Sequence, residues 1–291
     1  MQNPVLSILY FAVVPLIAII FEGLHRKFIA RFENRIGPPI LQPYYDLRKL
    51  WRKKTLNDGN DPFFRSAPFL YFLTTYALFL LIPFSIISFD YDFILLIYLT
   101  ILGSAFYTLA GVSSDSPYAI VGSMREMILM VCYEITLAIS VFTFMIFSKS
   151  LSLSAMNPNL LVLSLPLASI ALIASAIVEL KITPFDTAEA STEILSSMET
   201  EYSGKELFFM EITKYLKRLF YVLLIPLLFF GLSNPALYVA GGLAVLLCLS
   251  FTQASTPRYR VDQTFTYLFI IMVIALIEFI RVVGGFTWAL P

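Results

Sequence analysis

Stretches of about twenty mostly apolar residues recur along almost the whole 291-residue chain. A helix needs roughly 20 such residues to cross the hydrocarbon core of a bilayer. The composition agrees, because 58% of the residues are hydrophobic and only 14% are charged, whereas soluble domains are about a quarter charged. We therefore predict an all-α integral membrane protein with about eight transmembrane helices and short amphipathic cytoplasmic helices. The expected spans are Val5–Leu24, Ala67–Phe89, Asp92–Val112, Met127–Phe147, Asn159–Leu180, Leu207–Leu232, Pro235–Phe251 and Thr264–Val283.

The basic residues separate to one side of these spans. All of the 20 Lys and Arg residues except Lys149 and Arg281 fall on the same side of the predicted topology. Because Lys and Arg mark the cytoplasmic side, we expect a multi-pass protein of the cell membrane with both termini outside. Residues 1–291 then form a single polytopic domain. It has two long cytoplasmic connections. We call residues 25–66, which are basic, the docking loop, and residues 181–206 the acidic loop.

Several classes of function are disfavoured by the composition. The chain has two cysteines and one histidine, whereas an iron–sulfur cluster takes about four thiolates. It contains no GxGxxG or GxxxxGK[ST] string for nucleotide phosphates, and its formal net charge of zero argues against nucleic-acid binding. We therefore predict no catalytic residue, no metal ligand and no cofactor in this chain. A stand-alone transporter would show inverted repeats, which the sequence does not suggest.

A carboxylate inside a predicted span is a strong functional signal, because an ionisable group near the membrane centre costs several kcal/mol. Glu134 lies about seven residues into the fourth predicted span, roughly 10 Å deep. Arg125 and Glu126 precede it at the mouth of that helix, and Glu179 closes the fifth span. A structural salt bridge is the alternative to a functional role for Glu134.

The acidic loop carries a second group of carboxylates. Thr183 can cap a new helix with Pro184 at its first position. On that helix Asp186, Glu189 and Glu193 would share one face. Like charges on one face repel, so we expect at least one raised pKa, as a proton relay requires. A solvated acidic face is an equally good explanation of the spacing.

The docking loop contains an amphipathic pattern. Leu47, Leu50 and Trp51 share a helical face, and basic residues occupy the other. This pattern is typical of a helix lying in the membrane surface. We expect it to contact a docked partner or a lipid-soluble substrate.

Five segments spread over nearly the whole chain form a recognisable set. They are Arg26-Lys27 to Pro38, Leu41-Gln42-Pro43 to Leu50, Arg125 to Tyr133-Glu134, Glu179 to Gly204, and Arg258 to Gln263. Taken together, they resemble one family, the membrane subunit known as subunit 1 or H that joins the two arms of respiratory complex I. Asp115-Ser116-Pro117-Tyr118 is most similar to the branch found in archaeal group 4 energy-converting membrane-bound hydrogenases and a sulfur-reducing sister complex.

The resemblance implies a non-catalytic connecting subunit of a ferredoxin-oxidising, ion-pumping complex that translocates protons or sodium ions. Its partners would be soluble hydrogenase-like large and small subunits, antiporter-like membrane subunits and the lipid bilayer. Iron–sulfur clusters, and a nickel–iron site in a hydrogenase, would belong to those partners. The proton pathway would comprise Glu126, Glu134, Glu179, Asp186, Glu189, Glu193 and Glu201. The docking residues would be Arg26, Arg35, Asp46, Lys49, Arg125, Arg258, Arg260 and Asp262.

Departures from the quinone-reducing pattern bear on the electron acceptor. Quinone-reducing members have Asn where this chain has Pro39, and Glu where it has His25. Their Arg before Pro-Phe-Asp is also missing here. These differences favour the hydrogenase-type branch. A quinone-reducing subunit, a subunit of the sulfur-reducing sister complex and a passive membrane anchor remain as alternatives.

Overall fold

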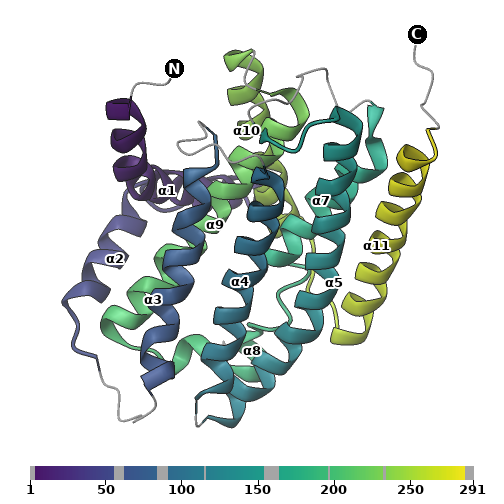
Figure 1. Ribbon diagram of the computed structural model, residues 1–291. Coiled ribbons are helices and arrows are strands. Elements are labelled where there is room, and N and C mark those ends of the chain that lie inside the picture. The colour runs from purple at the N-terminus through teal and green to yellow at the C-terminus, as the bar shows by residue number, and fades with distance from the viewer. Residues whose placement is uncertain are drawn as a thin grey trace.

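The computed structural model describes residues 4–55, 62–83, 91–114, 116–153, 164–195, 197–231 and 234–285. Within these ranges every regular element is helical, as predicted (Figure 1). The elements are α1 (Pro4–Phe32), α2 (Gln42–Arg52), α3 (Pro62–Ala77), η1 (Leu78–Leu80), α4 (Asp92–Val112), α5 (Pro117–Ser148), α7 (Pro166–Glu179), α8 (Ser191–Ile194), η3 (Ser197–Thr200), α9 (Gly204–Phe230), α10 (Pro235–Ser255) and α11 (Val261–Val283).

Six helices in the described part of the chain are long and apolar enough to cross a membrane. They are α1, α3 continued by η1, α4, α5, α10 and α11. The other two predicted spans correspond to α7, which is described over 14 residues, and to the 27-residue α9, which carries charges. The start of α1 and the end of α11 lie at the same end of the bundle (Figure 1), as an even number of crossings requires. Residues 84–89, 159–163 and 232 of the predicted spans fall outside the described ranges.

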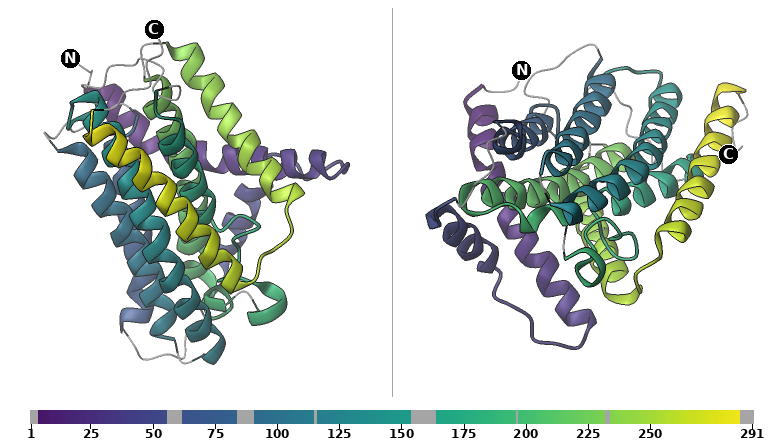
Figure 2. Two further views of the ribbon diagram at one scale, coloured as in Figure 1. Left: turned by 90° about the vertical axis from the view of Figure 1, so that its right-hand side faces the viewer. Right: turned by 90° about the horizontal axis from the view of Figure 1, so that it is seen from below.

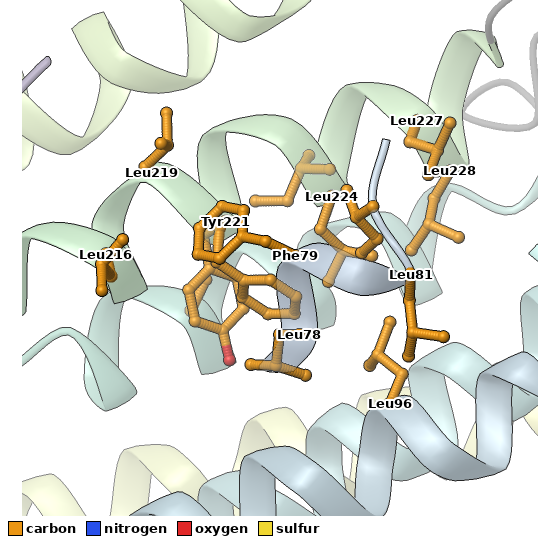
Figure 3. Packing of buried hydrophobic residues seen from close by; sticks show 14 of the residues in the cluster. Leu78, Phe79, Leu81, Leu96, Leu216, Leu219, Tyr221, Leu224, Leu227 and Leu228 are labelled. Atoms are coloured by element: carbon orange, nitrogen blue, oxygen red, sulfur yellow. The ribbon is translucent and has the colours of Figure 1, made fainter. Parts of the chain in front are cut away.

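The least apolar predicted span forms the centre of the bundle. Helix α9 packs against α1, α2, α3, α7 and α10. Its Leu216, Tyr221 and Leu224 are buried together with Phe79 of η1 and Leu96 of α4 (Figure 3). Because protein surrounds α9, its charged side chains can meet polar partners without facing lipid. The low hydropathy of the predicted span Leu207–Leu232 therefore gave no indication that this helix lies at the centre of the bundle.

Helices α10 and α11 lie at the outside and keep large apolar side chains exposed. Examples are Leu243 on α10, and Phe269 and Ile277 on α11. Exposed apolar faces of this extent are typical of surfaces that contact lipid or membrane partners.

Most of the docking loop is helical. Helix α1 bends, with Pro15 inside it, and its second half runs across the other helices (Figure 2). It continues to Phe32, beyond the predicted end of the first span at Leu24. The predicted amphipathic helix is confirmed as α2, with Leu47 buried and Trp51 half-exposed.

The predicted helix beginning at Thr183 is wrong. Residues 181–190 form turns and bends, and only the four residues of α8 are helical. The reason is a set of long-range contacts with the end of α10 and with the connection that follows it. The Thr183 hydroxyl donates to the Gln253 carbonyl at 3.0 Å, and the Tyr259 amide donates to the Pro184 carbonyl at 3.0 Å. The Thr183 hydroxyl and the Pro184 carbonyl, which the predicted helix would use for its own first turn, are thus bound to residues 253–259. Because no helix forms here, Asp186, Glu189 and Glu193 do not share one helical face.

Gly23 on α1 allows the close approach of the docking loop. A Cβ at Gly23 would overlap the carbonyl oxygen of Ile40, whereas a Cβ at Gly103 would lie 3.4 Å from its nearest neighbour, Thr74 Oγ1. We expect Gly23→Ala to destabilise the protein, because overpacking costs about 1–3 kcal/mol and helix propensity returns at most about 1 kcal/mol. Thermal unfolding in detergent checks this, with Gly103→Ala as the control expected to be at least as stable as the unaltered protein. Equal effects of the two changes would contradict the close packing.

Candidate functional site

A polar cavity of about 230 Å³ opens among the elements around α9. Both acidic and basic side chains line its walls, which is unusual inside an apolar helical bundle. The lining residues are Tyr71, Tyr107, Glu179, Leu180, Lys181, Asp186, Glu189, Lys214, Lys217, Arg218 and Gln253. The cavity thus brings the predicted carboxylates of α7 and of the acidic loop to one place.

The outer cluster, defined as Lys181, Glu189, Glu199 and Lys214, joins the acidic loop to α9. Glu189 accepts from Lys181 Nζ at 2.9 Å, from Lys214 Nζ at 3.0 Å and from the Tyr107 hydroxyl at 2.5 Å. Lys214 also pairs with Glu199. Burial acts to raise the pKa of Glu189, but the two ammonium groups outweigh it and hold that pKa well below its usual range. Glu189 is therefore ionised at neutral pH.

The inner cluster, defined as Ser104, Glu134, Glu179 and Lys217, lies deeper among α4, α5, α7 and α9. Lys217 Nζ is 2.9 Å from Glu179 Oε1, and these side chains are 7% and 1% exposed. The Tyr221 hydroxyl also donates to Glu179. Lys217 Nζ donates to Ser104 Oγ at 3.3 Å, and Ser104 Oγ donates to Glu134 Oε1 at 2.8 Å. One ammonium group thus links the two carboxylates that lie in predicted spans.

Glu126 connects the outer cluster with the helix that carries Glu134. Its Oε2 is 3.7 Å from Lys181 Nζ, and its Oε1 accepts from the Tyr133 hydroxyl at 3.1 Å. Glu126 and Tyr133 are buried, and Tyr133 immediately precedes Glu134 on α5. The predicted pathway residue Glu126 is therefore part of the network.

Two further carboxylates lie nearer the surface, each with its own cation. Asp186 pairs with Arg258 at 2.6 Å and Glu193 with Arg125 at 2.7 Å. Burial raises the pKa of Asp186, and the neighbouring Glu189 carboxylate adds to this, while Arg258 opposes it. The expected raised pKa is thus found at Asp186, with burial as its first cause.

A separate group of ion pairs ties α1 to α2 and α9. Glu22 accepts from Arg26 Nε at 2.9 Å and pairs with Arg218. Arg26 also donates to Asp46 at 3.0 Å and to the Tyr215 hydroxyl at 2.9 Å. Arg26 and Asp46 were predicted to organise docking, and they contact each other within the chain.

The remaining predicted docking residues divide by exposure. Arg35, Lys49, Arg260 and Asp262 are exposed, whereas Arg125 and Arg258 hold the acids described above. Arg260 and Asp262 lie 3.5 Å apart with both side chains more than 80% exposed. The predicted pathway residue Glu201 is half-buried and forms no ion pair with any residue that the structure describes.

Several residues of this site were not predicted from the sequence to belong to the proton pathway. They are Glu22, Tyr107, Lys181, Lys214, Lys217, Arg218 and Tyr221. A signal existed for three of them, because Lys214, Lys217 and Arg218 place three cations within two turns of an otherwise apolar helix. The partner of each could not be read from the sequence, since it depends on how α9 packs.

The comparisons with known proteins agree over almost the full chain. The family model described as NADH dehydrogenase matches residues 5–283. The chain is similar to a subunit of the NADH-quinone oxidoreductase of Dehalococcoides mccartyi, with 28% identity over 89% of this chain and 80% of that protein. It is also similar to NADH-ubiquinone oxidoreductase chain 1 of Branchiostoma lanceolatum, with 32% identity over 88% of this chain and 86% of that one.

A solved structure has nearly the same fold. It is a chain of the membrane-bound sulfane sulfur reductase, an archaeal respiratory membrane complex, with a TM-score of 0.86 and 25% sequence identity. The match covers 95% of this chain and 98% of that one.

Proposed function

This chain belongs to the NADH dehydrogenase family of complex I membrane subunits, and we propose that it transmits energy from a docked soluble module to ion-translocating membrane subunits. It is a membrane subunit of a respiratory complex. In our proposal the exposed residues Arg35 and Lys49 of the docking loop contact the soluble subunits, together with Arg260 and Asp262 at the start of α11. The loops that carry them face the cytoplasm, and both termini lie outside.

A single observation carries this proposal: the outer and inner clusters line one polar cavity, and side-chain contacts continue from Lys217 through Ser104 to Glu134. Glu189 and Lys214 of the outer cluster share the 230 Å³ cavity with Glu179 and Lys217 of the inner cluster. Two unit charges 4 Å apart interact by about 4 kcal/mol at an effective dielectric constant of 20. A change of charge at the loop therefore alters the protonation energy of the next group, and the series can pass that change inward.

The proposed sequence of events starts at the surface. Electron transfer in the soluble module alters charge or packing beside Asp186 and Glu193. The outer cluster responds, then Glu179 and Lys217, and finally Glu134. From there the response passes to antiporter-like subunits. The rival is a passive anchor, in which the same ion pairs only hold the helices together.

Variants of Glu193 test the outer end of the relay. Glu193→Gln is expected to leave electron transfer to a soluble acceptor unchanged and to weaken coupled ion transport, because Arg125 loses its carboxylate. Both rates are measured on the complex in sealed vesicles. Glu201→Gln is the matched control, since Glu201 lies in the same acidic loop and forms no ion pair with any residue that the structure describes. Transport that stays normal in Glu193→Gln would count against a relay starting there.

The pKa of Asp186 gives a pH prediction. Arg258 opposes the rise in that pKa, so Arg258→Gln should raise it further and the carboxyl should take up its proton at higher pH. We expect the acid-side decline of ions moved per electron to shift to higher pH. The control is Lys149→Gln, which removes an exposed cation just past the end of α5 and should leave the profile unchanged. Identical profiles for Arg258→Gln and the unaltered complex would contradict the prediction.

We propose that the complex is of the hydrogenase type, with ferredoxin as electron donor and protons as electron acceptor. The departures at His25, Pro39 and the segment before Pro184 support it. The structural similarity to a sulfane sulfur reductase supports a sulfur-compound acceptor as the second candidate. Metal analysis of the complex purified with its partners separates the two. About one nickel with abundant iron is expected of a hydrogenase, and iron without nickel would point to a sulfur- or quinone-reducing complex.

A further inference from the structure

An apolar groove of about 580 Å³ lies between α2 and the helices that it covers. This volume is within the range of about 300–1,000 Å³ that is typical of pockets for small molecules. Most of the wall is apolar, including Ile19 of α1, Phe72 of α3, and Phe208 and Phe209 of α9. The groove shares no lining residue with the polar cavity of the proposed relay.

The charged residues that line this groove are two arginines on one helix. Arg48 and Arg52 lie one turn apart on α2, and both are exposed. Neither forms a salt bridge with any residue that the structure describes. Asp46, the acidic residue of α2, is occupied by Arg26. The guanidinium groups at the groove are therefore available for an external anion.

Aromatic side chains at the groove fit a position at the edge of a bilayer. Trp51 is 50% exposed and Tyr44 is 43% exposed. Trp51 packs edge-on against Phe208, with ring centroids 5.0 Å apart. Trp and Tyr are enriched where membrane meets water, because their rings are apolar and their tips polar.

We propose that this groove binds one anionic phospholipid, with an acyl chain among the apolar residues and the phosphate between Arg48 and Arg52. The shape of the site requires an amphiphile, and the two cations require a negative headgroup. Arginine pairs with phosphate through parallel N–H donors, and basic pockets beside membrane helices recognise anionic lipids. A neutral isoprenoid would fill the apolar part and leave both guanidinium groups without an anion.

The test is lipid retention by the whole complex. The complex is placed in nanodiscs of equal parts phosphatidylglycerol and phosphatidylcholine, and the lipid that remains bound is identified by native mass spectrometry. We expect phosphatidylglycerol to be retained in preference. Arg48→Gln/Arg52→Gln should reduce that retention by roughly 30-fold, the contribution expected of two basic residues. Arg48→Lys/Arg52→Lys should keep most of it.

A charge-matched control is available on the same segment. Lys53→Gln/Lys54→Gln removes two exposed cations that do not line the groove, and it should leave retention within about twofold of the unaltered complex. Equal retention of the two lipids by the unaltered complex would overturn the proposal. So would a phosphate-free lipid in the groove, or equal losses in the glutamine variants of Arg48/Arg52 and of Lys53/Lys54. The first comparison uses no variant, so equal retention of the two lipids overturns the proposal even if the arginine variant does not assemble.

Discussion

Lys217→Met is expected to lower the free energy of unfolding by about 3–5 kcal/mol, the range measured when one partner of a buried ion pair is removed. Lys217 lies 2.9 Å from Glu179, and both side chains are almost fully buried. Methionine fills much of the space but leaves the Glu179 carboxylate without its cation in the protein interior. Unfolding of the isolated chain by a denaturing detergent measures the loss.

Two comparisons separate this loss from a general effect of removing lysine. Lys149→Met removes an exposed lysine just past the end of α5 and should change stability by less than about 1 kcal/mol. Adding Glu179→Gln to Lys217→Met removes both charges, so it should recover most of the lost stability. A double variant as unstable as Lys217→Met would show that the pair is not the cause.

Glu134→Gln is expected to reduce the number of ions moved per electron by roughly tenfold or more, because a positioned proton-transfer group contributes about 10²–10⁴-fold. In the unaltered protein the Ser104 hydroxyl donates to Glu134 at 2.8 Å. Glutamine keeps the shape of Glu134 and can still accept that hydrogen bond. It cannot change its charge. Electron transfer to a soluble acceptor should be unaffected, since the chain carries no redox group in this account. Both rates are followed together on vesicles that contain the complex.

Glu201→Gln is a useful comparison for Glu134→Gln. Both residues were predicted to belong to the pathway, but Glu201 forms no ion pair in the described part of the chain. We expect Glu201→Gln to retain coupling. If Glu134→Gln also retains it while Glu201→Gln does not, the path through Ser104 and Lys217 is wrong.

The sequence predicted the long apolar helices better than it predicted their arrangement. Long apolar runs predicted α4 and α11 almost to the residue, because bilayer thickness fixes the length of a spanning helix. Helix ends beyond the membrane were missed, since α1 continues to Phe32 on residues that are no longer apolar. The pattern of Leu47, Leu50 and Trp51 predicted α2 because amphipathicity is a local property.

Most carboxylates of the candidate site were predicted from the sequence, whereas its lysines were not. Glu134 and Glu179 were recognisable because a carboxylate in a span is costly. Their shared partner Lys217 is distant from both in sequence and is brought to them by the packing of α9 against its neighbours. The helix predicted at Thr183 failed for the same kind of reason, since contacts with residues 253–259 override local preference.

The central claim is that the buried pair of Glu179 and Lys217 transmits energy and does not merely hold helices together. The most direct test is the ratio of ions moved to electrons transferred by the complex carrying Glu179→Gln and Lys217→Met together. Our account predicts a complex that assembles, is close to the unaltered protein in stability and transfers electrons, yet has lost most of its coupled transport. A ratio equal to that of the unaltered complex would contradict the relay and leave this chain as a passive anchor.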